Sequence, residues 1–260
     1  MEVIVTCSNP PASESSIKSV HIESGTIRAI KSCGPYGIKS IHHANNCSLA
    51  SESSSSYLIH MGSTSNKKDV YAALLENLPN QSLKWKCRLH SEISSPFITS
   101  HCGCFVLAGN TLGSICVWDN KGDLLSVTKA HYRKVTKLEM ISNGGFVVSG
   151  GDDGIVHMWN LSDLCTCSNE NDSDEFVDGD GISAIHSWSE HSLPVTSLCA
   201  LPNNLMISAS LDRLVVIMEC CNGHTLAKIS LPSAITVLEV DQSNYNRLFV
   251  GGKSKGLLDH

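Results

Sequence analysis

The most restrictive feature of this 260-residue sequence is a segment that occurs twice in its second half. Each copy starts at a histidine and passes through an apolar run that ends in serine. An aspartate follows four residues after that serine, before another β-rich run. The copies contain His131, Ser149 and Asp153, and His191, Ser208 and Asp212. Such a repeat predicts that one supersecondary unit is used several times, because a single copy cannot bury its own apolar face.

A weaker third copy precedes these two in residues 105–119. It contains Trp118, and the tryptophan of the next copy, Trp159, lies 41 positions later, which is the period of a four-stranded propeller blade. Runs of Val, Ile and Leu alternate with turns rich in Gly, Asn, Asp and Ser, and only residues 71–76 show a helix-like period. The sequence therefore predicts an all-β chain that forms a β-propeller of about six blades, the last of them incomplete.

The shared residues resemble those of WD repeats. The resemblance implies that the His131 imidazole donates to the Asp153 carboxylate, while Ser149 connects this imidazole to the indole N–H of Trp159. Buried polar groups need partners, so a network of this kind fixes a turn only when each member is present.

The other two copies depart from this pattern. The second keeps the His, Ser and Asp positions but has Met218 in place of the tryptophan, so its network should be looser. The third has Ala108 and Leu112 at the Ser and Asp positions, and only Trp118 is expected to represent the network there.

Several segments narrow the resemblance further. They are Leu107-Ala108-Gly109, Ala130 to Thr136, a Trp-Ser-x-His-x-x-Pro-Val-Thr arrangement from Trp188 to Thr196, Ser210 to Arg213, Ser230 to Leu238 and Leu248 to Gly252. Together they are similar to the WD repeat-containing protein 18 family, the WD-repeat subunit of the Rix1 complex. The similarity extends from about residue 97 to residue 252 and is thin before it.

The resemblance implies a non-enzymatic scaffold without cofactors that acts in the nucleus, in both nucleolus and nucleoplasm. Its implied partners are Rix1-type and Ipi1-type subunits and pre-60S particles, and its implied role is removal of the second internal transcribed spacer from pre-rRNA, with a further link to DNA replication initiation. Self-association is not expected, because the family's C-terminal extension is missing. A generic WD-repeat adaptor, or a substrate receptor for a chromatin or ubiquitin-ligase machine, is the alternative.

We expect one propeller domain over residues 1–260. Degenerate first blades occupy 1–96, clearer WD repeats 97–256, and an acidic insertion between blades 165–183, and the pattern is lost in 257–260. The missing half-blade would leave an open sheet edge that recruits other chains, which predicts poor solubility.

Charge and apolar content exclude other classes of protein. The formal net charge is −6, and Lys and Arg are absent from 138–212, so binding of nucleic acid by charge alone, or with direct sequence specificity, is not expected. No apolar run is long enough for a membrane span, and the N-terminus lacks the features of a secretory signal. The twelve cysteines are therefore expected to be reduced thiols that serve as small core residues.

Four local patterns invite sharper interpretations. Ser149, His131 and Asp153 are the residue types of a catalytic triad, but their recurrence favours a structural role over a catalytic one. The cysteine groups at 101–104, 165–167 and 220–221 lack the paired spacing of zinc sites, and the acidic run at 170–180 departs from a calcium loop. Alternation of Lys84, Lys86 and Arg88 with apolar residues predicts a protected outer strand more readily than an RNA contact.

Overall fold

The computed structural model describes side chains in residues 92–119, 121–141, 144–166, 182–241 and 247–252. Before residue 92 it describes seven strands by their backbone alone, and it does the same for Lys253. Within these described parts every regular element is a strand except one five-residue helix. The all-β prediction is therefore confirmed.

The first two sheets lie in the compact unit made of Met1–Glu92, His101–Val106 and Trp118–Asp123. One sheet has the order β1-β2-β3 and the other β4-β5-β6-β7, with all neighbours antiparallel. Their strands are β1 (Glu2–Ser8), β2 (Ser15–His21), β3 (Ile27–Ser32), β4 (Tyr36–Ala44), β5 (Ser56–Ser63), β6 (Val70–Glu76) and β7 (Ser82–Leu89).

The helix-like reading of residues 71–76 is wrong, because this segment is strand β6. It pairs with β5 on one side and with β7 on the other. A short apolar run fits either period, and pairing on both edges selects the strand here. β7 is an edge strand, as the outer-strand interpretation of Lys84, Lys86 and Arg88 requires, although these side chains lie outside the described ones.

The third sheet has the order β11-β10-β9-β8 and carries the weak repeat copy. Its strands are β8 (Ile98–Thr99), β9 (Phe105–Gly109), β10 (Ser114–Asp119) and β11 (Leu124–Lys129). The two central strands are almost wholly buried, which agrees with their continuous apolar sequence.

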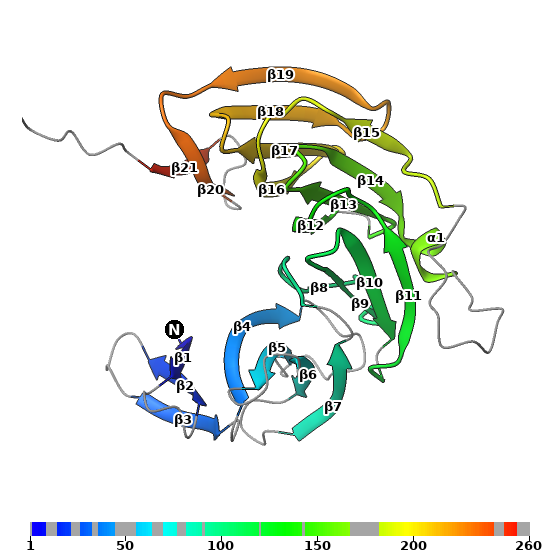
Figure 1. The fold of residues 1–260 in the computed structure, drawn as a ribbon. Helices are drawn as coiled ribbons and strands as arrows, with labels where there is room; N and C mark the ends of the chain where they lie inside the picture. Colours follow the sequence, from blue (N-terminus) through cyan, green and yellow to red (C-terminus); the bar gives the residue numbers. More distant parts are fainter. Residues whose placement is uncertain are drawn as a thin grey trace, which may run out of the picture. The chain divides into compact units, whose positions relative to one another are not determined.

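The second compact unit comprises Ile93–Ser100, Leu107–Val117 and Leu124–His260, and the two clearest repeat copies form complete sheets in it. They have the orders β12-β13-β14-β15 and β16-β17-β18-β19, and a two-stranded sheet β20-β21 follows (Figure 1). The bounds are β12 (Val135–Met140), β13 (Phe146–Gly151), β14 (Val156–Asn160), β15 (His186–Trp188), β16 (Val195–Leu201), β17 (Leu205–Ser210), β18 (Leu214–Glu219), β19 (His224–Ser230), β20 (Ala234–Val240) and β21 (Leu248–Lys253).

The same irregularity recurs at the start of three sheets. The pairing register shifts between Val135 and Lys137 in β12, between Val195 and Ser197 in β16, and at the matching place in β20. A bulge that recurs at one position bends each first strand in the same way. These sheets are therefore copies of one unit in backbone detail as well as in sequence.

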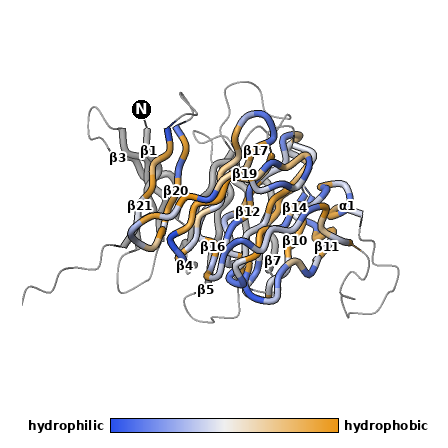
Figure 2. The backbone as a smooth tube through the Cα atoms, turned by 90° about the horizontal axis from the view of Figure 1, so that it is seen from above, coloured by the Kyte–Doolittle hydropathy of each residue, from blue (hydrophilic) through white to orange (hydrophobic). Residues whose placement is uncertain are grey.

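The sheets of this unit pack face to face through apolar side chains. One cluster joins β12–β15 to β16–β19 and includes Met158, Trp188 and Met206, each at most 4% exposed. A second joins β16–β19 to β20 and includes Ile235 and Leu238. In Figure 2 the apolar stretches follow the strands and the hydrophilic ones the turns between them. Burial on this scale is the main stabilising contribution to such sheets.

Close packing between sheets explains one glycine in the repeat. A Cβ atom on Gly150 would lie 2.7 Å from Cγ1 of Val195 in the next sheet. Any larger residue would have to push the two sheets apart, which a densely packed interior resists.

The acidic insertion does not lie between blades as we expected. It follows β14 and precedes β15, and these two strands pair within one sheet. The three-residue strand β15 is too short for its sheet to be assigned from sequence. The helix α1 (Leu161–Cys165), capped by the Asn160 side chain, starts this connection, whereas residues 167–181 and 257–260 lie outside the described part.

No helix in the described part of the chain is long and apolar enough to cross a bilayer.

Candidate functional site

Four side chains from the first repeat copy meet in one chain of hydrogen bonds. The Nδ1 atom of His131 lies 3.0 and 3.2 Å from the two carboxylate oxygens of Asp153. The opposite ring nitrogen, Nε2, lies 2.8 Å from the Ser149 hydroxyl. That hydroxyl accepts a hydrogen bond of 3.0 Å from the Trp159 indole N–H. The structure thus brings together the four residues that the sequence grouped.

The surroundings of His131 decide the direction of these bonds. Burial lowers the pKa of this imidazole more than the nearby Asp153 carboxylate raises it, so the ring is neutral at physiological pH. A neutral ring has one donor, and the carboxylate can only accept, so Nδ1–H donates to Asp153. Nε2 then accepts from the Ser149 hydroxyl. The chain runs from indole N–H to hydroxyl to imidazole to carboxylate, and no member lacks a partner.

This network fastens the loop before β12 to the turn after β13. The Asp153 carboxylate also accepts from the backbone N–H groups of Tyr132 and Ile155, at 3.1 and 3.2 Å. The Asp152 N–H donates to the Lys134 carbonyl at 2.9 Å. Asp153 therefore ties the loop of His131 and Tyr132 to its own turn at Ile155.

The second copy repeats the arrangement without its indole. His191 Nδ1 lies 3.3 and 3.2 Å from the Asp212 oxygens, and Nε2 lies 2.8 Å from the Ser208 hydroxyl. Met218 is fully buried in its own sheet and offers no donor. One contact to aspartate is longer than in the first copy, at 3.3 against 3.0 Å, whereas the other contact to aspartate and the contact to serine have the same lengths in both copies. What the second network lacks is one donor.

The electrostatics of the second network parallel those of the first. Burial lowers the pKa of His191 against the opposing effect of Asp212. Desolvation acts to raise the pKa of Asp212, but the backbone N–H groups of Leu214 and Ser192, together with His191, outweigh it and lower that pKa. The pair is accordingly a neutral imidazole donating to a carboxylate.

In the third copy another residue takes over the turn. The Asn110 carboxamide oxygen accepts from the backbone N–H groups of Leu112 and Ser114, at 3.0 and 2.8 Å. Ser95 Oγ accepts from the Gly109 N–H at 2.6 Å. Sequence comparison of the copies missed Asn110 because it stands two positions before the expected aspartate. The signal available was an Asn-x-x-Gly turn between two apolar runs.

Ser149 cannot act as a nucleophile in this arrangement. Its side chain is fully buried, and its hydroxyl both accepts from Trp159 and donates to His131. A nucleophilic serine needs an exposed position next to an oxyanion hole. The recurrence of the group at Ser208 is typical of a structural element.

The cysteines differ from the sequence expectation in part. Cys116 and Cys220 are buried, and burial raises the pKa of these thiols to about 12 and about 11. Cys102, Cys104 and Cys221 are exposed, so they are not core residues. All seven described cysteines are free thiols, and the described residues contain no cluster of three or more His, Cys, Asp or Glu that could hold a metal ion.

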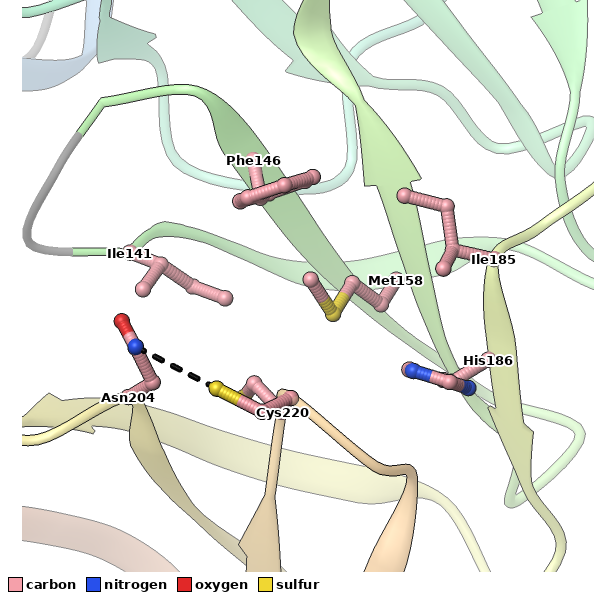
Figure 3. Close-up of a pocket in the computed structure, with 8 residues that line it drawn as sticks. Ile141, Phe146, Met158, Ile185, His186, Asn204 and Cys220 are labelled. Atoms are coloured by element: carbon pink, nitrogen blue, oxygen red, sulfur yellow. Dashed lines mark hydrogen bonds between the residues drawn. The ribbon is translucent and has the colours of Figure 1, made fainter.

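An apolar pocket of about 260 Å³ lies between the sheets β12–β15 and β16–β19. Figure 3 shows Ile141, Phe146 and Met158 on one side, with Asn204 and Cys220, the residue after β18, on the other; Cys221 also lines the pocket. The Asn204 carboxamide donates to Cys221 Sγ at 3.3 Å. The lining also includes Ile185 and His186, so the pocket offers shape and apolar contact together with one imidazole and two thiols.

Comparison with known proteins identifies the repeat. The family model for the WD domain, G-beta repeat, matches residues 122–160 and 182–217. The chain is 28% identical to the pre-rRNA-processing protein crb3/ipi3 of Schizosaccharomyces pombe over 62% of this chain and 36% of that protein. It is 30% identical to WD repeat-containing protein 18 of Homo sapiens over 58% of this chain and 33% of that protein.

Two further matches are informative. The chain is 31% identical to the protein ROOT INITIATION DEFECTIVE 3 of Arabidopsis thaliana over 54% of this chain and 31% of that protein. A chain in the crystal structure of the mitotic checkpoint complex superposes with a TM-score of 0.62 at 15% identity, over 91% of this chain and 65% of that one, and this likeness concerns the fold alone.

The matches confirm the expected similarity to the WD repeat-containing protein 18 family and the WD-repeat β-propeller fold class. The chain spans about a third of the length of the curated relatives named above.

Proposed function

We propose that this chain is a non-enzymatic WD-repeat scaffold in ribosome biogenesis, and that it supports pre-rRNA processing in the nucleus as part of a Rix1-type complex. The observation that carries the proposal is the similarity to proteins named for pre-rRNA processing in two fungi and to WD repeat-containing protein 18 in vertebrates. Function does not follow from the fold itself, because propellers serve many unrelated roles.

The geometry is consistent with a scaffold. The polar groups of the repeat are buried and saturated with hydrogen bonds to each other, so they hold loops in place. A rigid framework that displays loops is the general arrangement by which repeat proteins bind partners. In the proposed complex the partners are Rix1-type and Ipi1-type subunits and, through them, pre-60S particles, and the processing step is removal of the second internal transcribed spacer.

Affinity purification of the chain from its own cells, with mass spectrometry of the bound proteins, tests the assembly. Northern analysis of pre-rRNA after depletion tests the processing step. We expect Rix1-type subunits in the purified material and accumulation of a precursor that retains the spacer. Re-expression of the 260-residue chain should restore processing, and a Ser149→Ala variant, which weakens one blade, serves as a partially active control.

Other outcomes would redirect the proposal. Copurification of chromatin or ubiquitin-ligase subunits, with normal pre-rRNA, would favour a generic adaptor. Normal pre-rRNA after depletion, together with absence of Rix1-type subunits, would refute the ribosome-biogenesis role. A link to DNA replication initiation would require a delay in S-phase entry that persists when pre-rRNA processing is intact.

A further inference from the structure

A turn and a loop from the second compact unit form an exposed surface that the repeat network does not use. The turn joins β9 to β10 and carries Leu112, which is 65% exposed. The loop joins β11 to β12 and carries Tyr132, which is 89% exposed. We name this the Tyr132 surface, and it comprises Leu112, Lys129, Tyr132, Arg133 and Lys134.

The turn and the loop are in direct contact. The Gly113 carbonyl accepts from the N–H groups of both Ala130 and His131, at 3.0 and 2.8 Å. A Cβ atom on Gly113 would lie 2.2 Å from the His131 carbonyl and 2.4 Å from the Arg133 carbonyl. The Lys129 ammonium donates to the Leu112 carbonyl. Leu112 and Tyr132 are therefore displayed by backbone segments that touch each other.

Hydrogen bonds to more buried residues hold both the turn and the loop in place. Asn110 fixes the turn through two hydrogen bonds to its carboxamide oxygen. Asp153 fixes the loop through the N–H of Tyr132, and the buried His131 anchors the same loop. A surface that is ordered before binding loses little conformational entropy when a partner arrives.

The surface combines large apolar groups with positive charge. Lys129, Arg133 and Lys134 are exposed, and Arg133 makes no ion pair with any described residue. Lys134 faces Asp152 at 3.8 Å, which is a weak contact in water. Tyrosine and arginine are the residue types enriched at the energetic centres of protein interfaces. This concentration of cations contrasts with their complete absence from residues 138–212.

We propose that the Tyr132 surface docks an acidic, leucine-containing segment of a partner protein. Carboxylates of the segment would pair with Arg133 and Lys129, and an apolar side chain would lie between Leu112 and Tyr132. A short peptide is favoured over RNA because the basic residues are few: after Lys137 no Lys or Arg follows until Arg213, and Asp152 and Asp153 adjoin the surface, so an extended polyanion would meet negative charge. The inference goes beyond the proposed function and does not depend on it.

The test uses the full 260-residue chain and fluorescence anisotropy. The probe is a short fluorescein-labelled peptide of glutamates with leucines between them. We expect saturable binding that weakens as salt is raised. Arg133→Glu and Leu112→Ser should each weaken it about tenfold, in line with the loss of a central interface contact. Circular dichroism checks that both variants stay folded.

A matched control separates this surface from general charge. Lys121 is also exposed but lies in the turn at the other end of β10. Lys121→Glu makes the same kind of charge reversal and should leave peptide binding unchanged.

Three outcomes would overturn the proposal. The first is no saturable binding up to about 1 mM peptide, the weak end of measurable affinity. The second is equal loss of binding in the Lys121 control. The third is preference for a uridine oligonucleotide that the Arg133 variant abolishes, which would make the surface an RNA contact. Pre-rRNA processing need not change in any of these outcomes, so the two proposals fail separately.

Discussion

Replacing Ser149 by alanine gives the sharpest test of the repeat network. The hydroxyl accepts from the Trp159 indole N–H and donates to Nε2 of His131. Its removal leaves one donor and one acceptor unpaired in a site where both rings are at most 3% exposed. A buried polar group without a partner costs about 1–3 kcal/mol, and for the neutral groups involved here we take about 1–2 kcal/mol each. We therefore expect Ser149→Ala to lower the free energy of unfolding by about 2–4 kcal/mol.

The second repeat copy provides a matched control within the same chain. Ser208 is as deeply buried as Ser149 and makes the same 2.8 Å contact with its histidine, but Met218 donates nothing to it. Ser208→Ala leaves a single acceptor unpaired and should cost about 1–2 kcal/mol, roughly half as much as the first substitution.

Urea unfolding monitored by circular dichroism measures the free energy of unfolding of each variant by linear extrapolation to zero urea. A double variant isolates the indole contribution. Ser149→Ala combined with Trp159→Phe removes the Trp159 N–H donor together with the Ser149 hydroxyl that accepts from it. After comparison with Trp159→Phe alone, the serine substitution should cost about 1–2 kcal/mol less than in the wild-type background. Equal losses for Ser149→Ala and Ser208→Ala, or strict additivity in the cycle, would refute the hydrogen-bond account.

Three further predictions concern other buried groups. Burial and the nearby Glu239 raise the pKa of Glu139 to about 7, so the chain is more stable while this carboxyl is protonated and loses stability as the pH rises from 4.5 to 7. In urea unfolding, Glu139→Gln should therefore stabilise the chain by about 1–2 kcal/mol at pH 8 and have little effect at pH 4. Burial and His131 lower the pKa of His157 to about 4, so the unfolded state takes up the proton first and stability should fall as pH drops from 6.5 to 4; His157→Asn should flatten this slope in thermal melts. Thr128 Oγ1 is buried and has no hydrogen-bond partner among the described residues, so Thr128→Val should raise the unfolding free energy by about 0.5–1 kcal/mol, and a loss of stability would show that the hydroxyl is satisfied.

The sequence was sufficient to predict the fold class because the same residue pattern occurs more than once in it. His131 and Ser149 recur as His191 and Ser208, and the distance from the imidazole Nε2 to the serine Oγ is 2.8 Å in both copies. Repetition removes the ambiguity of a single short motif, because chance would not place the same residue types at the same spacing twice.

The errors fall where no second copy supports the reading. Residues 71–76 resemble a helix until β5 and β7 pair with both edges of β6, and pairing is a non-local fact. The short strand β15 belongs to the sheet of β14, but three residues carry too little pattern to show it. Asn110 takes the turn-fixing role two positions before Leu112, the residue aligned with the aspartates of the other copies, so alignment of the copies alone did not point to it.

The repeated hydrogen-bond network and the exposed loops are directly connected. Asp153 accepts from the buried His131 ring and from the backbone N–H of Tyr132, whose side chain is exposed. The polar groups that resemble a catalytic triad in sequence therefore hold a loop in place. The exposed residue of this loop differs between the copies: Ser192 occupies the position of Tyr132 in the second copy, and its backbone N–H donates to Asp212 in the same way. If binding specificity lies in these displayed positions, exchange of Tyr132 for serine should remove partner binding while the unfolding free energy stays within about 0.5 kcal/mol of the wild type, since surface substitutions away from buried groups have small effects. A large loss of stability in that variant would mean that the loop is part of the framework.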